Sequence, residues 1–177
     1  MQQLIKDLLA YSRLTSRGDA FKPVRCDGVA QDAIDNLKTA IEESGAKIML
    51  PDGTLPTVMG DKTQLTQLFQ NLIGNAIKFR SDRPLEVQIE VKRDAKQNWW
   101  QFSIKDNGIG MDVQYADKIF MIFERLHTTE QYPGIGLGLA LCKKIMERHG
   151  GEIWVESERG KDRRFTLRYP PSARWVT

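Results

Sequence analysis

The hydrophobic residues of this 177-residue chain recur with two different periods, and each period predicts a different kind of element. Spacings of three and four residues predict helices over residues 2–17, about 29–43 and about 61–78, and a further helix that opens at Gly134 and stops at Gly150. Alternation of hydrophobic and polar residues predicts strands over residues 85–92, 99–106, 152–156 and 163–169.

The remaining segments are shorter or less regular. Residues 47–50 and 55–59 are extended pieces on either side of a Pro-Asp-Gly turn, which predicts an irregular hairpin. The stretch 112–133 predicts a short helix followed by a mobile loop. Helices and strands segregate without a repeated βαβ unit, so we expect an α+β fold, a two-layer sandwich in which helices cover one face of a sheet.

The first helix has an apolar stripe that must be buried against another surface. It could dock on its own domain, or it could be half of a helical hairpin or coiled coil whose other half is missing. Gly18 can end the helix, and the Gly18-Asp19 turn and Pro23 separate it from the rest of the chain. These features favour the second interpretation.

The helix that starts at Asp61 has the clearest signals. Asp61 is a good N-cap, and Gln64 three residues later completes a start that resembles a capping box. Besides its apolar face, the helix carries one row of polar residues at spacings of four, four and three: Gln67, Asn71, Asn75 and Lys78. A solvated face usually carries Glu and Lys, and asparagine lowers helix propensity, so the row indicates function. Carboxamide oxygens suit Mg²⁺, and a lysine suits a phosphate.

Composition and charge narrow the classes of function. The chain is 41% hydrophobic and 28% charged, as expected of a globular domain with a core. A net charge of +3, with no basic run interleaved with aromatic residues, argues against a nucleic-acid partner. Cys26 and Cys142 lie far apart without metal-ligand spacing, which predicts reduced thiols in an intracellular protein. No signal peptide and no apolar run of ~20 residues occurs, so we expect a cytoplasmic chain whose parent protein is soluble or membrane-associated.

Two glycine motifs indicate a ligand. Asp106-Asn107-Gly108-Ile109-Gly110-Met111 follows a predicted strand, where a carboxylate could accept a hydrogen bond from a purine amine, although Asp-Asn-Gly is also an ordinary turn. Gly134, Gly136 and Gly138 open a helix, whose free N–H groups suit phosphate oxygens. Arg125 could add a cation, or could be a surface residue. Together with the polar row, these are the parts of an ATP site.

With these motifs the chain resembles the ATP-binding catalytic domain of two-component sensor histidine kinases, of the Bergerat or GHKL superfamily. Four boxes of that family occur in order: residues 70–79, 106–111, 119–126 and 134–139, followed by the typical closing segment 149–157. The resemblance covers about residues 25–170. The local sequence around residues 125–127 and 132–134 is similar to that of phytochrome-like kinases of bacteria.

The resemblance implies a mixed sheet covered by about three helices, with a mobile lid over ATP. It implies that Asn71 coordinates Mg²⁺, that Asn75 and Lys78 contact phosphates, and that Phe79 closes on the nucleotide. Asp106 would take the adenine amino group, next to Gly108, Ile109, Gly110 and Met111. Arg125 would reach the phosphates from the lid, and Gly134, Gly136, Leu137 and Gly138 would shape the lid hinge and the phosphate end. Ile135 departs from the commoner threonine, so a hydroxyl contact is lost there.

The resemblance also implies partners. Residues 1–18 would be the end of the dimerisation hairpin, 19–170 the catalytic domain and 171–177 a tail. The acceptor histidine would lie on the missing part of the hairpin, because His127 falls in the lid and His149 ends a helix. We expect transfer of the γ-phosphate to that histidine, a response regulator downstream and a possible homodimer through the first helix.

Two rivals within the superfamily are less consistent with the residues. Chaperone-type and mismatch-repair-type ATPases have a catalytic glutamate one turn before the key asparagine, where this chain has Gln67, and no acid lies between Asp61 and Asp82. An anti-sigma-type kinase or an ATP-binding interaction module without histidine kinase activity remains as the alternative. The first helix argues against it.

Overall fold

The computed structural model describes residues 9, 12, 20–122 and 136–170. Its elements follow the chain in this order: β1 (Lys22–Arg25), α2 (Cys26–Asn36), α3 (Lys38–Ser44), β2 (Lys47–Met49), β3 (Thr57–Gly60), α4 (Lys62–Lys78), β4 (Glu86–Asp94), β5 (Trp99–Asp106), the 3-10 turns η1 (Val113–Tyr115) and η2 (Lys118–Phe120), α5 (Gly138–Arg148), β6 (Glu152–Ser157) and β7 (Arg163–Tyr169). Within these residues, no helix is both long enough and apolar enough to span a membrane.

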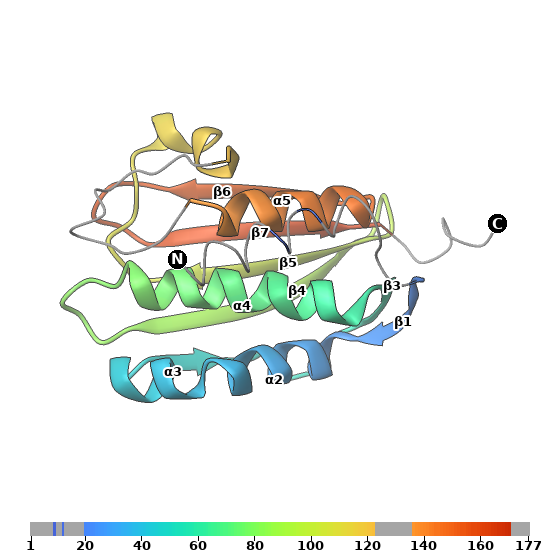
Figure 1. Ribbon diagram of the computed structural model, residues 1–177, viewed down its shortest axis with the longest axis horizontal. Helices are drawn as coiled ribbons and strands as arrows, with labels where there is room; N and C mark the ends of the chain where they lie inside the picture. The colour runs from blue at the N-terminus through green and yellow to red at the C-terminus, as the bar shows by residue number, and fades with distance from the viewer. Residues whose placement is uncertain (1–8, 10–11, 13–19, 123–135, 171–177) are drawn as a thin grey trace.

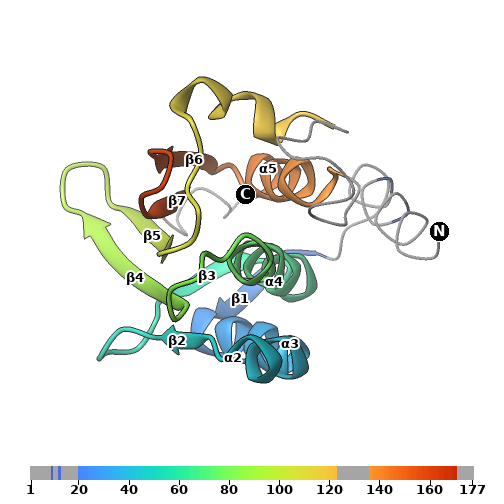
Figure 2. The same ribbon diagram turned by 90° about the vertical axis from the view of Figure 1, so that its left-hand side faces the viewer.

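The molecule has two layers (Figure 1). A five-stranded sheet in the order β2-β4-β5-β7-β6 forms one layer, and α2, α4 and α5 form the other, as Figure 2 shows from the side. The β2–β4 pair is parallel and the other pairs are antiparallel, so the sheet is mixed. This architecture confirms the predicted α+β sandwich.

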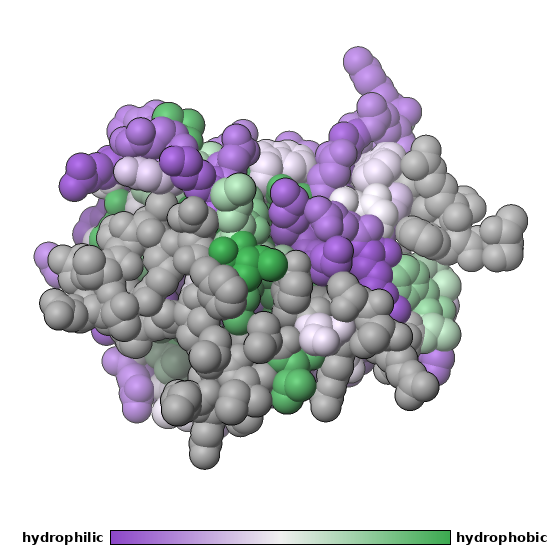
Figure 3. All heavy atoms as spheres, turned by 45° about the horizontal axis from the view of Figure 1, so that its top comes forward, coloured by the Kyte–Doolittle hydropathy of each residue, from purple (hydrophilic) through white to green (hydrophobic). Residues whose placement is uncertain are grey.

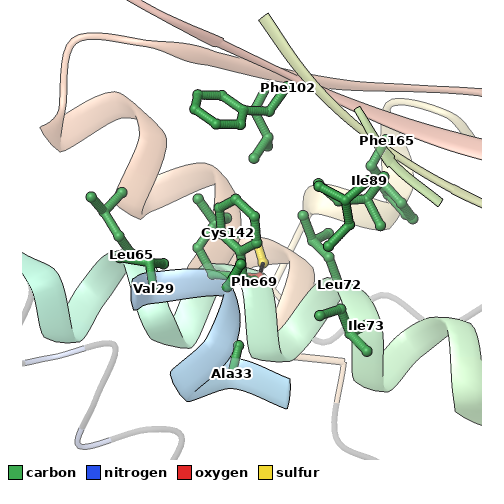
Figure 4. Close-up of a cluster of buried hydrophobic side chains, with 14 of the residues drawn as sticks. Val29, Ala33, Leu65, Phe69, Leu72, Ile73, Ile89, Phe102, Cys142 and Phe165 are labelled. Carbon is green, nitrogen blue, oxygen red and sulfur yellow. Dashed lines mark hydrogen bonds between the residues drawn. The ribbon is translucent and has the colours of Figure 1, made fainter. Parts of the chain in front are cut away.

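The core lies between the layers, where α4 supplies a broad apolar face (Figure 4). Phe69 of α4 meets Phe102 of β5 edge to face, with ring centroids 6.1 Å apart. The labelled neighbours in this cluster come from α2, α4, the sheet and α5: Val29, Ala33, Leu65, Leu72, Ile73, Ile89, Cys142 and Phe165. Cys26 and Cys142 are unpaired, as predicted, and burial raises the pKa of both thiols to about 12. The described part of the outer surface is mostly hydrophilic on the face in Figure 3, with a few hydrophobic residues among grey atoms.

The predicted hairpin over residues 47–50 and 55–59 is wrong. Lys47–Met49 pairs in parallel with β4, whereas Thr57–Gly60 pairs with β1 in a separate two-stranded sheet. Strand β1 was not predicted, because its four residues contain Pro23 and proline commonly interrupts regular structure. Proline is compatible with an edge strand, and here Pro23 lies opposite Met59.

Three helix boundaries differ from the prediction. The helix expected over 29–43 begins at Cys26 and is interrupted at Leu37, which separates α2 from α3; Gly45 ends α3 with φ +65° as expected. The helix expected in 112–133 consists of the two 3-10 turns as far as residue 122. Helix α5 begins at Gly138, four residues after the predicted start. The predicted first helix lies almost entirely outside the described residues, and only Leu9 and Ser12 are seen, both helical.

Asp61 caps α4 as predicted, because its Oδ1 accepts a hydrogen bond from the Gln64 N–H at 3.1 Å. The reciprocal half of a capping box is absent. The backbone N–H of Asp61 donates instead to Nε2 of His149 at 3.1 Å, while Nδ1–H of His149 donates to the carbonyl of Ile145 at 2.8 Å. His149 is fully buried and stacks on the Phe21 ring. It therefore connects the start of α4 to the end of α5 as a neutral imidazole, and it is not available as a phosphate acceptor.

Acid should weaken the fold through His149. Burial lowers the pKa of His149, so the unfolded chain binds a proton below about pH 6.5 that the folded chain does not. The free energy of unfolding is then highest above this pH and falls as the pH drops, by up to about 1.4 kcal/mol between pH 7.5 and 5.5. Urea unfolding at both pH values measures the change.

One substitution controls for this effect. His149→Gln should reduce the difference in the free energy of unfolding between the two pH values. An equal difference in wild type and His149→Gln would contradict the assignment.

Candidate functional site

The polar row of α4 lies beside its buried face. Gln67, Asn71, Asn75 and Lys78 are all half-buried, so the row borders the core instead of facing open solvent. The packing of Leu68, Leu72 and their apolar neighbours against the sheet fixes this orientation, because residues three and four apart share a face. The predicted row is therefore held rigidly at the junction of the two layers.

The start of α5 lies next to the middle of this row. The Asn71 side-chain amide donates to the carbonyl of Gly138 at 3.4 Å, which leaves its carbonyl oxygen available to a ligand. Gly136 has φ +74°, a conformation that favours glycine, and Leu137 is buried. A Cβ at Gly138 would meet the Asn71 carboxamide at an ordinary 3.9 Å. Neighbouring side chains therefore do not require a glycine at 138, and approach of a phosphate stays the predicted reason for it.

Asp106 ends β5 inside the protein, with only 2% of its side chain exposed. Its Oδ1 accepts a hydrogen bond from the Gly108 N–H at 3.1 Å, and its Oδ2 accepts one from Nε of Arg163 at 3.0 Å. The ordinary Asx-type turn that an Asp-Asn-Gly sequence predicts is therefore present. The same carboxylate is also half of a buried ion pair.

Arg163, which is not among the predicted site residues, is the partner of Asp106. Its guanidinium also donates from Nη2 to the carbonyl of Asn75 at 3.2 Å, so it connects β7 to α4. It lies over the rings of Phe79 and Phe165, at 5.5 and 5.2 Å from the ring centroids. Arg163 and its neighbour Arg164 look like two surface charges in the sequence. Only the pairing of β5 with β7, in which Asp106 is opposite Arg163, places one of them inside.

The turn after Asp106 is fixed by the protein itself. The Ile109 N–H donates to the carbonyl of Phe79 at 3.0 Å, and the Met111 N–H donates to Oγ of Ser157 at 3.0 Å. A Cβ at Gly108 would lie 2.4 Å from the Phe79 carbonyl oxygen, a distance that packing does not allow. This glycine was predicted to let a ligand approach. The structure supplies a second reason, because Phe79 at the end of α4 needs the space.

The last turn of α4 carries the remaining predicted contacts. Lys78 places its ammonium 4.9 Å from the centre of the Phe79 ring. Two cations, those of Lys78 and Arg163, thus lie close to this ring at the C-terminal end of α4. Arg125 and Gly134 lie outside the described residues, as do the predicted lid and His127. Hydrogen bonds from Asn71 to Gly138, from Arg163 to Asn75 and from Ile109 to Phe79 bring the other predicted residues to one region between α4, the end of β5 and the start of α5. Figure 1 shows these three elements.

The donors of this region fit Mg²⁺ only as part of a complex with phosphates. The described residues contain no cluster of three or more His, Cys, Asp or Glu side chains that could hold a metal ion. Asn71 offers a neutral oxygen, a hard ligand suited to Mg²⁺. Magnesium commonly takes few protein ligands and completes its shell with waters and substrate phosphates. A single asparagine is compatible with that arrangement.

Comparison with curated proteins gives relatives that are sensor kinases and phytochromes. The chain is 48% identical over 174 residues to Cyanobacterial phytochrome A of Nostoc sp., covering 98% of this chain and 22% of the relative. It is 45% identical over 170 residues to Phytochrome-like protein Cph1 of Synechocystis sp., with coverage of 96% and 22%. It is 33% identical over 174 residues to Sensor protein kinase WalK of Staphylococcus haemolyticus, with coverage of 96% and 28%. The chain thus spans only 22–28% of the length of these proteins.

Solved structures agree on the fold. Full-length ShkA in complex with AMPPNP superimposes with a TM-score of 0.77 at 26% identity, covering 95% of this chain and 35% of that one. The catalytic domain of histidine kinase ThkA, free of nucleotide, gives a TM-score of 0.72 at 23% identity, with coverage of 86% and 96%. Residues 60–173, which include α4, the turn after β5 and the start of α5, match the family described as histidine kinase-, DNA gyrase B-, and HSP90-like ATPase. The chain belongs to this ATPase family, and its relatives are phytochrome-like and sensor histidine kinases.

Proposed function

We propose that this chain binds Mg-ATP and donates the γ-phosphate to a histidine on the dimerisation hairpin of its parent protein. The observation that carries the proposal is the meeting of three features in one region. The Asn71–Lys78 row of α4, the buried Asp106 and the glycine-rich start of α5 come together there, and Asn71 is hydrogen-bonded to Gly138 across two helices. The AMPPNP bound to the similar full-length ShkA supports ATP as the ligand.

Each residue has a proposed role. Asp106 accepts a hydrogen bond from the adenine amino group, and Ile109 and Met111 line the base with Gly108 and Gly110. Asn75 and Lys78 contact the phosphates, and Asn71 supplies an oxygen to Mg²⁺, which would neutralise phosphate charge when bound. Phe79 covers the base end, and Gly136, Leu137 and Gly138 present the first N–H groups of α5 to phosphate oxygens. In the proposed lid, Arg125 contributes a cation to the phosphates and Gly134 contributes to the hinge.

The residues of the site favour transfer over hydrolysis. In the transfer, the bond between the γ-phosphorus and the bridging oxygen breaks, an imidazole nitrogen bonds to the phosphorus, and ADP leaves. Positioning and charge stabilisation are the main needs of such a step. Activating a water would call for a carboxylate one turn before Asn71. Gln67 stands there, and the described part of α4 has no acidic residue.

The proposed partners follow from the relatives. The chain matches about a fifth of each phytochrome, so a longer parent protein would supply the sensor region and the acceptor histidine. Residues 1–18 would be the end of the dimerisation hairpin, and a homodimer would form through it. A response regulator would take the phosphoryl group from the histidine. The alternative is an ATP-binding interaction module that transfers no phosphate.

Phosphate transfer in trans tests the proposal. The chain is incubated with γ-labelled ATP, Mg²⁺ and a separate hairpin that carries the acceptor histidine. We expect label on the hairpin that is stable to alkali and lost in acid, as for phosphohistidine, and no label on a hairpin in which glutamine replaces that histidine. Label on a serine would contradict the kinase class. Binding of ATP without any transfer would support the interaction module.

A further inference from the structure

The cation beside Asp106 is buried almost as deeply as the carboxylate itself. Asp106 and Arg163 are direct partners across β5 and β7, and their side chains are 2% and 7% exposed. Removing two charges from water is costly unless the pair is well bonded. Arg163 meets this condition by donating from Nε to Asp106 Oδ2 and from Nη2 to the carbonyl of Asn75. It therefore crosses from the sheet to α4 at the point where β5 ends.

The pair leaves hydrogen-bonding capacity on both partners. A guanidinium has five N–H donors, and Arg163 uses two of them on the described residues. A carboxylate accepts about four hydrogen bonds, and Asp106 accepts one on each oxygen. Because Nε and Oδ2 are 3.0 Å apart, a group with spare donors and a group with spare acceptors are neighbours at the end of β5.

The order of acceptor and donor matches one kind of base. Adenine carries an amino group at C6, a donor, with an acceptor nitrogen on each side of it, N1 in the six-membered ring and N7 in the five-membered ring. Guanine and hypoxanthine carry an oxygen at C6, which would face the Asp106 carboxylate as a second acceptor. An unpaired buried acceptor is disfavoured.

We propose that Arg163 is a specificity-determining residue that reads a ring nitrogen of adenine while Asp106 reads its amino group. The inference rests on the proposed function, because it requires that the base lie against Asp106. Arg163 also positions Asp106, since its second hydrogen bond fixes the guanidinium to α4. Its exposed neighbour Arg164 provides a matched control on the same strand.

Titration with ADP analogues tests this reading. ADP, 1-deaza-ADP and 7-deaza-ADP each retain the amino group, and each deaza analogue lacks one of the two ring nitrogens. They are titrated into the whole chain as wild type, Arg163→Met and Arg164→Met. We expect one deaza analogue to bind wild type at least about tenfold more weakly than ADP, which identifies the nitrogen that Arg163 contacts. Arg163→Met should bind ADP about as weakly as wild type binds that deaza analogue, and it should bind ADP and the analogue equally. Arg164→Met should behave as wild type.

The outcomes separate the inference from the proposed function. Equal binding of ADP and both analogues to wild type would overturn the inference. This comparison needs no substitution, so the test remains possible even if Arg163→Met does not fold. Discrimination that persists in a folded Arg163→Met would overturn it as well, and would leave Arg163 a structural role alone. No binding of ADP to wild type would instead contradict the proposed function, and the inference with it.

Discussion

Asp106→Asn is expected to lower the affinity for ATP by about tenfold or more. The neutral amide replaces a buried carboxylate oxygen that would accept from the adenine amino group, and a hydrogen bond to a charged group contributes about 1.5–3 kcal/mol. The same change leaves Arg163 buried without an ionised partner, which is expected to cost about 3–5 kcal/mol of stability. Calorimetric titration with ATP and urea unfolding measure the two effects separately.

Asp94→Asn is the control for this prediction. Asp94 lies at the other end of the same sheet and accepts hydrogen bonds from the Lys96 and Gln97 N–H groups in an exposed turn. The chemical change is the same, but neither ATP affinity nor the Arg163 pair should be affected. Unchanged ATP affinity in a folded Asp106→Asn chain would rule out Asp106 as the residue that reads the base.

Gly110→Ala is expected to lower the free energy of unfolding by about 3 kcal/mol or more. Gly110 has φ +64°, where a non-glycine residue costs about 1–2 kcal/mol. The added Cβ would also lie 2.2 Å from the Glu158 carbonyl oxygen and 2.4 Å from that of Lys161, so the β6–β7 turn would have to move. Overpacking of this kind typically costs about 1–3 kcal/mol. Urea unfolding with an unchanged m-value measures the loss.

Gly160→Ala separates the cost of the backbone conformation from the cost of the steric overlap made by the new Cβ. Gly160 has φ +77° in the neighbouring turn, and its N–H donates to the carbonyl of Ile109 at 2.9 Å, but a Cβ there would meet nothing within 4 Å. The free energy of unfolding of this variant should fall only by the cost of the backbone conformation, about 1–2 kcal/mol. Equal losses in Gly110→Ala and Gly160→Ala would show that the β6–β7 turn yields to the new methyl group, contrary to this account.

The features predicted correctly from the sequence depend on local patterns. The N-cap at Asp61, the polar row on α4 and the strands β4 and β5 each follow from residues within a few positions of one another. The resemblance to histidine kinases added an expected arrangement of the site, and the family match confirmed that the chain belongs to the histidine kinase-, DNA gyrase B-, and HSP90-like ATPase family. Local signals were therefore sufficient for most of the helices and strands, and the ordered motifs indicated the family.

The features missed depend on contacts between distant residues. The strand β1 is four residues long and contains Pro23, so only its pairing with β3 reveals it. The partner of the Asp61 N–H is His149, 88 residues away, and not the nearby Gln64. Arg163 and Asp106 are 57 residues apart, and their pairing requires the strand order of the sheet. Spacing along the chain contains no signal for any of these three contacts.

The central claim is that α4, the end of β5 and the start of α5 form one ATP site. Calorimetric titration of the wild-type chain with ATP, with and without Mg²⁺ and with GTP for comparison, tests it most directly. We predict one saturable binding event per chain, with weaker binding when Mg²⁺ is removed and weaker binding of GTP. No saturable binding of Mg-ATP, or equal binding of ATP and GTP, would contradict the account.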